Sequence, residues 1–299
     1  MDGQTTNPSL IAKTLKLKNA CRKGKIHIKK EVYDFYRNVI TEISGLIPDG
    51  SVSIEVYADA ATTADAMFTQ GKEMYTWIPN AHIKYPTTAA GLEAARKIGT
   101  GRHAGTGPSA SARTGRSSFM RQPSGAVKGQ VFLSPFVGRL DDIGQNGMDL
   151  IKNILEMYRE SDHHVEVLSA SVRTLEHFMS AIQMQSDIIT APYKVIREWA
   201  EKGMPIPDAS FSYTRPDLQP VPEEKLNLDQ QWQNFSIQHD LTSKRIENLK
   251  RRLERPCSVT QKIHGTPLQR FNAGGRRCAG RNHEIARAIP RLPQHHSGP

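Results

Sequence analysis

A lysine near the end of a short apolar stretch has a clear chemical use. Lys84 lies within AHIKYPTT at 81–88, among β-forming residues and two positions before a proline. This pattern predicts a strand that ends at Tyr85 and a helix that begins near Thr88. Burial and cationic neighbours lower the pKa of a lysine, so a neutral amine here could attack a carbonyl and form a Schiff base. Most lysines at strand ends are not catalytic, so the hypothesis depends on the residues around it.

Polar residues at the ends of other predicted strands supply partners for this lysine. They are an amide, a carboxylate, hydroxyls and two arginines: Asn7, Glu55, Ser134, Arg139, Ser171, Arg173 and Thr190. Glu55 could move protons through a water, and Asn7 could orient the lysine or a substrate hydroxyl. Arg139 and Arg173 could clamp a phosphate in bidentate fashion. The set favours Schiff-base chemistry on a ketose phosphate.

Strand and helix patterns alternate along the chain and would position these residues. Strands are predicted at 51–57, 81–85, 129–136, 165–170 and 187–190. Helices are predicted at 30–44, 62–77, 88–98, 146–160, 174–184 and 192–202. This alternation with short links is typical of an α/β fold, here a (β/α)8 TIM-type barrel with helices outside. Such barrels carry their chemistry at the carboxyl ends of the strands, where the polar set lies.

The net charge of +10 over 299 residues is unevenly distributed. Residues 244–299 hold 13 lysines and arginines against 3 acidic residues, and residues 98–128 hold 5 against none. The remainder is mildly acidic, with 22 basic and 27 acidic residues. Because the excess charge is confined to two segments, we expect no specific nucleic-acid partner.

Cysteine usage and hydropathy indicate the compartment. Cys21, Cys257 and Cys278 are odd in number and far apart, which predicts neither a disulfide framework nor a zinc site. No apolar run approaches membrane-spanning length, and no signal peptide is visible. We therefore expect a cytoplasmic protein with no membrane partner and no bound metal.

Seven stretches of the chain match motifs of one known enzyme family. They are DGQTTNPSLIA at 2–12, SIEVYAD at 53–59, WIPNAHIKYPTTAAGLEAA at 77–95, FLSPFVGRLDDIG at 132–144, VLSASVRTLEHF at 167–178, DIITAP at 187–192 and NFSIQHDLTSK at 234–244. In these stretches the chain resembles the transaldolases, class I aldolase-type barrels, and in particular the bacterial ones. The combination of TTNPS, a strand lysine and SPFVGR is specific to this family.

The resemblance implies a role for most of the polar set. Lys84 matches the Schiff-base lysine, and Glu55 matches the glutamate that works through a catalytic water. Asn7 matches the asparagine that contacts the lysine and the substrate. The other matches are Ser134, Phe136 and Arg139 in the substrate pocket, and Ser171 and Arg173 as the phosphate-binding pair.

The resemblance also implies a reaction. A dihydroxyacetone unit moves from sedoheptulose 7-phosphate to glyceraldehyde 3-phosphate, a step of the pentose phosphate pathway. No cofactor is implied, because the protonated imine accepts the electrons; the partners are sugar phosphates, and a homo-oligomer is left open. Two alternatives remain: a fructose 6-phosphate aldolase-like activity, and a catalytically inactive relic of a transaldolase.

The chain departs from the family pattern in two structural respects. It begins at what resembles the family's second strand, so we expect the first strand, with its catalytic aspartate, to be absent. Residues 99–127 stand where the fifth strand belongs but are rich in Gly, Ser and Arg and lack the family's Asn and Thr. Such a composition does not bury enough apolar surface to fold, so we expect the fifth strand to be replaced by a disordered segment.

Two frame slips would explain the unusual segments. Read one base earlier, the codons of 108–113 and 117–123 can encode the family-like LCFSQ and VFVHAAT. Read one base later, 251–257 can encode ADWNAL, a family-like ending. The expected organisation is therefore barrel units two to four at 1–98, an aberrant disordered segment at 99–128, barrel units six to eight at 129–203, a C-terminal extension with a helix at 204–249, and a disordered basic tail at 250–299.

Overall fold

Seven strands of the described chain form one parallel sheet, in the order in which they occur in the sequence. The computed structural model describes residues 2–7, 28–97, 103–107, 127–159 and 164–223, and the single residues 234, 237, 242, 246 and 247. All of them belong to one unit of the chain, Met1–Cys257. The strands in sheet order are β1 (Gly3–Thr5), β2 (Ser51–Glu55), β3 (Ala81–Pro86), β4 (His103–Gly107), β5 (Val131–Pro135), β6 (Val165–Ser169) and β7 (Ile188–Ile189).

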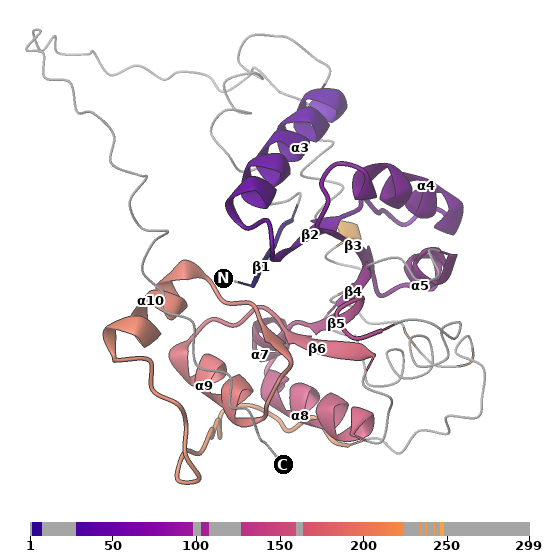
Figure 1. Cartoon of the computed structure of the whole chain (residues 1–299). Coiled ribbons are helices and arrows are strands. Elements are labelled where there is room, and N and C mark those ends of the chain that lie inside the picture. The colour runs from indigo at the N-terminus through magenta and orange to yellow at the C-terminus, as the bar shows by residue number, and fades with distance from the viewer. Residues whose placement is uncertain are drawn as a thin grey trace, which may run out of the picture. The chain divides into compact units, whose positions relative to one another are not determined.

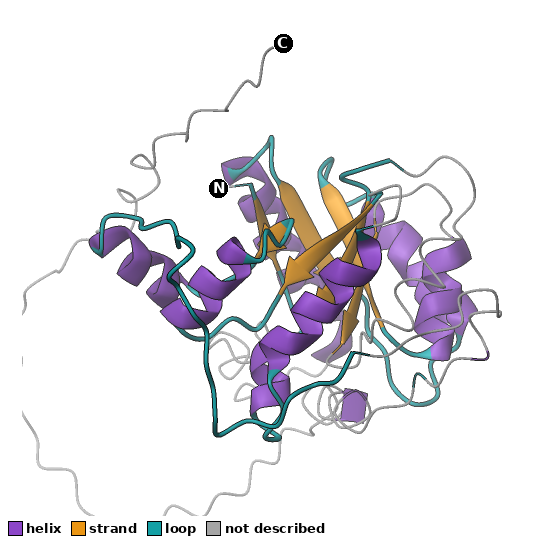
Figure 2. Cartoon of the chain, turned by 90° about the horizontal axis from the view of Figure 1, so that it is seen from below, coloured by secondary structure: helices purple, strands orange, loops and turns teal. Residues whose placement is uncertain are grey.

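A described helix follows each of these strands except β4, and the helices lie around the outside of the sheet (Figures 1 and 2). They are α3 (Ile28–Leu46), α4 (Ala64–Tyr75), α5 (Ala89–Lys97), α7 (Val137–Asp141), α8 (Gly147–Tyr158), α9 (Leu175–Gln183) and α10 (Tyr193–Glu201). Each helix predicted from apolar spacing is present with both ends within two residues of the prediction. The short α7 was not predicted, because five residues are too few to show a helical period. The predicted α/β class is confirmed.

Side-chain caps fix the start of three of these helices. In each, an oxygen of the residue before the first turn accepts a hydrogen bond from a backbone N–H that the helix itself leaves without a partner. The pairs are Thr63 with Ala66 in α4, Asn146 with Met148 in α8, and Thr174 with His177 in α9. The capping residues in the sequence thus determine where these three helices begin.

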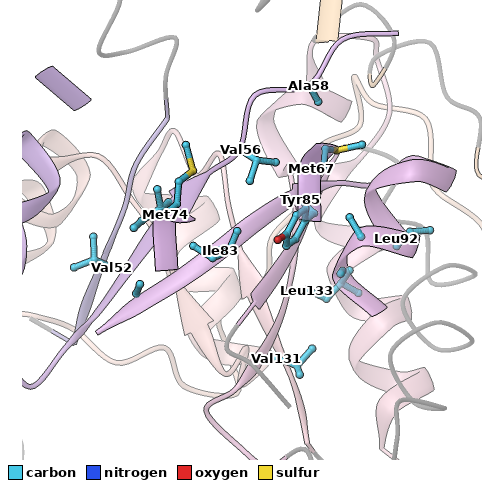
Figure 3. Close-up of a cluster of buried hydrophobic side chains, with 14 of the residues drawn as sticks. Val52, Val56, Ala58, Met67, Met74, Ile83, Tyr85, Leu92, Val131 and Leu133 are labelled. Carbon is cyan, nitrogen blue, oxygen red and sulfur yellow. The ribbon is translucent and has the colours of Figure 1, made fainter. Parts of the chain in front are cut away.

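The main core lies between the outer face of the sheet and the helices (Figure 3). Ile83 and Tyr85 of β3 are buried against α4 and α5, where Met67 and Leu92 contact the same cluster. Gly71 lets α4 come this close: a Cβ on it would lie 1.8 Å from the Tyr85 hydroxyl. Full burial of such apolar side chains contributes about 1.5–3 kcal/mol each.

The opposite face of the same strands carries buried polar side chains. Strand residues alternate between faces, so Ser53 and Glu55 point away from Ile54, and Lys84 points away from Ile83. The parallel register pairs Glu55 with Lys84. The inner face therefore receives the residues expected to do chemistry, while the helices cover the other face.

The two edge strands come together at their carboxyl ends. Thr5 Oγ1 of β1 lies 3.1 Å from Thr190 Oγ1, which directly follows β7. In a flat sheet with strands about 4.8 Å apart, the first and seventh strands would be about 29 Å apart. The sheet is therefore strongly curled, and it brings the carboxyl ends of all seven described strands towards one place.

The expectation that a disordered segment replaces the fifth strand is wrong for residues 103–107. Residues 103–107 form β4, which pairs with β3 on one side and β5 on the other. The physical reason is that strand pairing uses backbone N–H and C=O groups, which any non-proline sequence offers once two flanking strands are in place. Residues 99–102 and 108–126 of that segment and the tail at 250–299 lie outside the described residues.

Candidate active site

The predicted Schiff-base lysine and its carboxylate form a buried pair. Lys84 Nζ lies 3.5 Å from Glu55 Oε2, and the two side chains are only 7% and 6% exposed. The pair follows from the strand register, which sets Glu55 opposite Lys84 on adjacent strands. Because both strands are in the middle of the sheet, this geometry is fixed by backbone pairing rather than by loops.

A hydrogen-bond network ties this pair to β1 and α3. Lys84 Nζ donates to the Thr6 carbonyl at 3.4 Å, and the Thr6 hydroxyl donates to the Ser53 carbonyl at 2.6 Å. With its proton used there, the Thr6 hydroxyl accepts from the Tyr36 hydroxyl at 2.8 Å. Tyr36 in turn accepts from the Glu55 backbone N–H at 3.0 Å. One buried phenol therefore holds the carboxyl ends of β1 and β2, the two strands that lie on one side of the lysine strand β3.

Sequence reasoning missed Thr6 and Tyr36 as parts of the site. Tyr36 belongs to the apolar face of α3 and was read as core, and it is 2% exposed. Burial, partly offset by its hydrogen bonds, raises the pKa of its phenol well above the usual range, so it acts as a neutral donor and acceptor. Thr6 was within the TTNPS match, which was the available signal.

Other predicted residues lie at the same carboxyl edge of the sheet. Asn7 directly follows Thr6 and is half-buried. Ser134 is buried near the end of β5, and Phe136 follows it, packed against the inner-face cluster of Phe132, Leu168 and Ala170. Thr190 joins β7 to β1 as described above.

The two predicted phosphate-binding arginines converge on one carboxylate. Arg173 donates from Nη1 and Nη2 to the two oxygens of Asp142, at 2.5 and 2.6 Å. Arg139 Nη1 lies 3.5 Å from Asp142 Oδ2. Hydrogen bonding to Arg173 is the main cause that holds the pKa of Asp142 below its usual range. The structure thus brings Arg139 and Arg173 together, with an anion already between them.

Backbone geometry places Arg173 beside α7. Ser171 adopts a left-handed conformation with φ of 59°, and its carbonyl accepts from the Gly138 N–H at 3.2 Å. Gly138 is required by this close approach, because a Cβ there would lie 2.4 Å from Arg173 Nε. A serine with positive φ is uncommon and is typical of turns under functional constraint.

His177, which the sequence analysis did not predict as a site residue, holds the loop that carries Arg173. His177 Nε2 lies 2.9 Å from Asp141 Oδ2 and 3.0 Å from the Tyr213 hydroxyl, and its Nδ1 faces the Arg173 N–H at 3.4 Å. Burial would raise the pKa of Asp141, but hydrogen bonds from His177 and the Gly147 N–H hold it below its usual value. The motif VRTLEH contained the histidine, yet nothing in its spacing indicated the carboxylate partner.

The described residues offer neither a cluster of metal ligands nor a membrane-spanning helix. Within the described ranges, no group of three or more His, Cys, Asp or Glu side chains is placed to hold a metal ion. No helix in that part of the chain is both long enough and apolar enough to span a membrane.

Comparison with known proteins gives one consistent family. A family model described as Transaldolase/Fructose-6-phosphate aldolase matches residues 1–249. A probable transaldolase of Dehalococcoides mccartyi is 33% identical over 224 residues, which is 74% of this chain and 89% of that protein. Those of Chlorobaculum parvum and Roseiflexus sp. are 38% and 36% identical over 206 and 205 residues, covering 67% and 66% of this chain and 81% and 79% of those proteins. The chain belongs to the transaldolase/fructose-6-phosphate aldolase family.

Proposed function

We propose that this chain is a transaldolase that forms a Schiff base through Lys84. The observation that carries the proposal is the buried contact between Lys84 Nζ and Glu55 Oε2, at the carboxyl end of adjacent parallel strands. Family membership supports the same chemistry, and its named relatives are probable transaldolases. The proposed reaction moves a dihydroxyacetone unit from sedoheptulose 7-phosphate to glyceraldehyde 3-phosphate within the pentose phosphate pathway.

The reaction begins and ends on the lysine. Neutral Lys84 Nζ attacks the C2 carbonyl of the ketose, and loss of water gives an iminium ion. Glu55, acting through a water, takes the proton of the C4 hydroxyl as the C3–C4 bond breaks; the electron pair of that bond passes into the iminium to form an enamine, and erythrose 4-phosphate leaves as the aldehyde. The same proton returns to the new alkoxide oxygen in the addition that follows. The enamine carbon attacks the aldehyde carbon of glyceraldehyde 3-phosphate, and hydrolysis releases fructose 6-phosphate and the free amine.

Glu55 and its neighbours handle the protons of these steps. Glu55 contacts Nζ, so it can accept a proton from the ammonium form and return one through a water during loss and addition of water. The Thr6 carbonyl, 3.4 Å from Nζ, orients the amine. Asn7 and Ser134 would contact the substrate, and Phe136 would wall the pocket. Arg139, Ser171 and Arg173 would bind the phosphate.

Fructose 6-phosphate aldolase activity is the second candidate. The matching family model covers both activities, and both begin with the same Schiff base. The two differ in whether an acceptor aldehyde is needed: an aldolase releases free dihydroxyacetone from fructose 6-phosphate alone, whereas a transaldolase turns over only with an acceptor. Product analysis with and without erythrose 4-phosphate separates them.

We also propose the finer architecture and location that the family favours. The curled parallel sheet would be part of a (β/α)8 barrel, supported by the contact between Thr5 and Thr190 at its two edges. A cytoplasmic location is supported by the three scattered cysteines and by the phosphorylated substrates.

Borohydride trapping tests the proposed function. Purified protein is incubated with fructose 6-phosphate, reduced and digested, and peptides are searched for a three-carbon adduct. We expect the adduct on Lys84 and none on Lys97, an exposed lysine paired with Asp65 that serves as the internal control. Equal labelling of both lysines, or no adduct on Lys84, would overturn the proposal and favour the inactive relic.

A further inference from the structure

The carboxylate of Asp142 fills the position at which Arg173 would grip a phosphate. A guanidinium group offers two bidentate edges, and the Nη1/Nη2 edge of Arg173 is fully used by the two oxygens of Asp142. The other edge contains Nε, which lies against the backbone of α7, because a Cβ on Gly138 would be 2.4 Å from it. A phosphate can therefore make a two-point contact with Arg173 only by replacing Asp142.

The position of this pair makes such an exchange feasible. The side chains of Arg173 and Asp142 are 43% and 39% exposed, so water screens the pair and solvates either partner when they separate. Asp142 also has a second cation in reach, since Arg139 Nη1 is 3.5 Å from its Oδ2. The pKa of Asp142 is held low by Arg173 and Arg139, so the carboxylate is ionised at neutral pH.

We propose that Asp142 is an internal anion that competes with the substrate phosphate for Arg173 and thereby sets the selectivity of this subsite. A dianionic phosphoryl group carries twice the charge of the carboxylate and more acceptor oxygens, so it displaces Asp142. A singly charged carboxylate ligand offers Arg173 nothing that Asp142 does not already supply. The inference rests on the proposed function only in assigning Arg139 and Arg173 to the phosphate of the substrate.

Direct binding of inorganic phosphate to the full chain tests this role. Dissociation constants are measured by calorimetry at neutral pH for the unchanged protein, D142N and D65N. We expect D142N to bind phosphate about tenfold more tightly, the scale of one removed like-charge contact at a partly exposed site, and to bind acetate measurably. D65N removes the same charge from the exposed pair with Lys97 and should bind like the unchanged protein.

Three outcomes would overturn the inference. Phosphate binding to D142N that is unchanged or weaker would mean that Asp142 only orients Arg173 or plays no part, and so would the absence of measurable binding in both proteins. Tighter binding by D142N that persists in D142N/R173M would place the phosphate elsewhere. Circular dichroism melts of each variant check that it is folded.

Kinetics separates this inference from the proposed function. D142N should lower KM for fructose 6-phosphate several-fold more than it changes KM for unphosphorylated fructose, whereas D65N should change neither KM. Failure of borohydride trapping with tighter phosphate binding by D142N would reject the transaldolase and keep the role of Asp142. Successful trapping together with unchanged phosphate binding by D142N would keep the transaldolase proposal and reject the role of Asp142.

Discussion

The ion pairs Lys84–Glu55 and Arg173–Asp142 are held in very different ways. The first joins neighbouring central strands and is almost fully buried, with its partners set opposite each other by the sheet register. The second joins the loop after β6 to the end of α7, and about two fifths of each side chain is exposed. Burial gives the first pair one geometry, which a nucleophile needs. Exposure lets the second pair exchange partners, which recognition of a phosphate needs.

Removing the buried amine should have the largest effect. Lys84→Met eliminates the nucleophile, so we expect kcat to fall by more than about 10³-fold. It also leaves Glu55 as a buried charge without Lys84, at a cost on the order of 3 kcal/mol in unfolding free energy. Steady-state kinetics and urea unfolding measure the two effects.

A double variant separates chemistry from stability at this pair. In Lys84→Met with Glu55→Gln, both charges are gone, so most of the unfolding free energy should return while kcat stays low. Recovery of activity, or no recovery of stability, would show that the two residues do not act as a buried pair.

Removal of the Tyr36 hydroxyl, which holds the strands of the buried pair, should have the second largest effect. Tyr36→Phe removes the acceptor for the Glu55 N–H and the donor to Thr6, so we expect a loss of about 1–3 kcal/mol in unfolding free energy. Because the Thr6 carbonyl and Glu55 both position the lysine, kcat should fall more than KM changes. Tyr75→Phe on the exposed face of α4 is the matched control and should change neither. A Tyr36→Phe variant as stable and active as the unchanged protein would remove the phenol from the site.

Salt should act on the exposed pair and spare the buried one. Raising ionic strength from about 0.1 to 1 M shortens the Debye length from about 10 to 3 Å. We expect KM for fructose 6-phosphate to rise several-fold, because phosphate binding to exposed arginines is screened. Borohydride trapping of unphosphorylated dihydroxyacetone on Lys84 should change little. Equal sensitivity of both reactions would mean that the pairs do not differ as their burial indicates.

The pairing of Glu55 with Lys84 could be predicted from the sequence, but the residues that hold this pair in place could not. Glu55 and Lys84 stand in strands whose alternation and order are readable, and parallel register brings them together. Tyr36 was not identified, because its contact with Thr6 depends on how α3 is rotated against the sheet, and an apolar helix face does not encode that. The pairing of Arg173 with Asp142 joins loops 31 residues apart and needs the backbone of Ser171 and Gly138 in place.

The segment at 99–128 shows the other limit of sequence reasoning. Its composition argued against a strand, yet residues 103–107 pair on both sides, because backbone pairing tolerates almost any side chains between two existing strands. The two frame slips stay a prediction. The family match stops at residue 249, next to the predicted second slip. Resequencing the gene decides the matter, and an unbroken frame across 99–127 and 250–299 would exclude both slips.

Asp141 is intermediate in exposure between the two pairs, and its replacement should have a small effect on the pH dependence of unfolding. Its side chain is 10% exposed, and hydrogen bonds from His177 and the Gly147 N–H lower its pKa in the folded protein. A lowered folded pKa stabilises the protein above the unfolded value of about 3.9, and this contribution is lost as pH falls through the folded value. The unfolding free energy of Asp141→Asn should therefore fall less than that of the unchanged protein as the pH is lowered from about 5 to about 3.

Urea unfolding across that pH range measures this difference. Asp34→Asn, which removes one exposed carboxylate from α3, controls for the change in net charge and should follow the unchanged protein. If Asp141→Asn gives the same pH slope as the control, His177 does not stabilise the ionised carboxylate. Asp141 would then behave like the exposed Asp142. Burial would fix the charged groups in the strands but not those near the loop that carries Arg173.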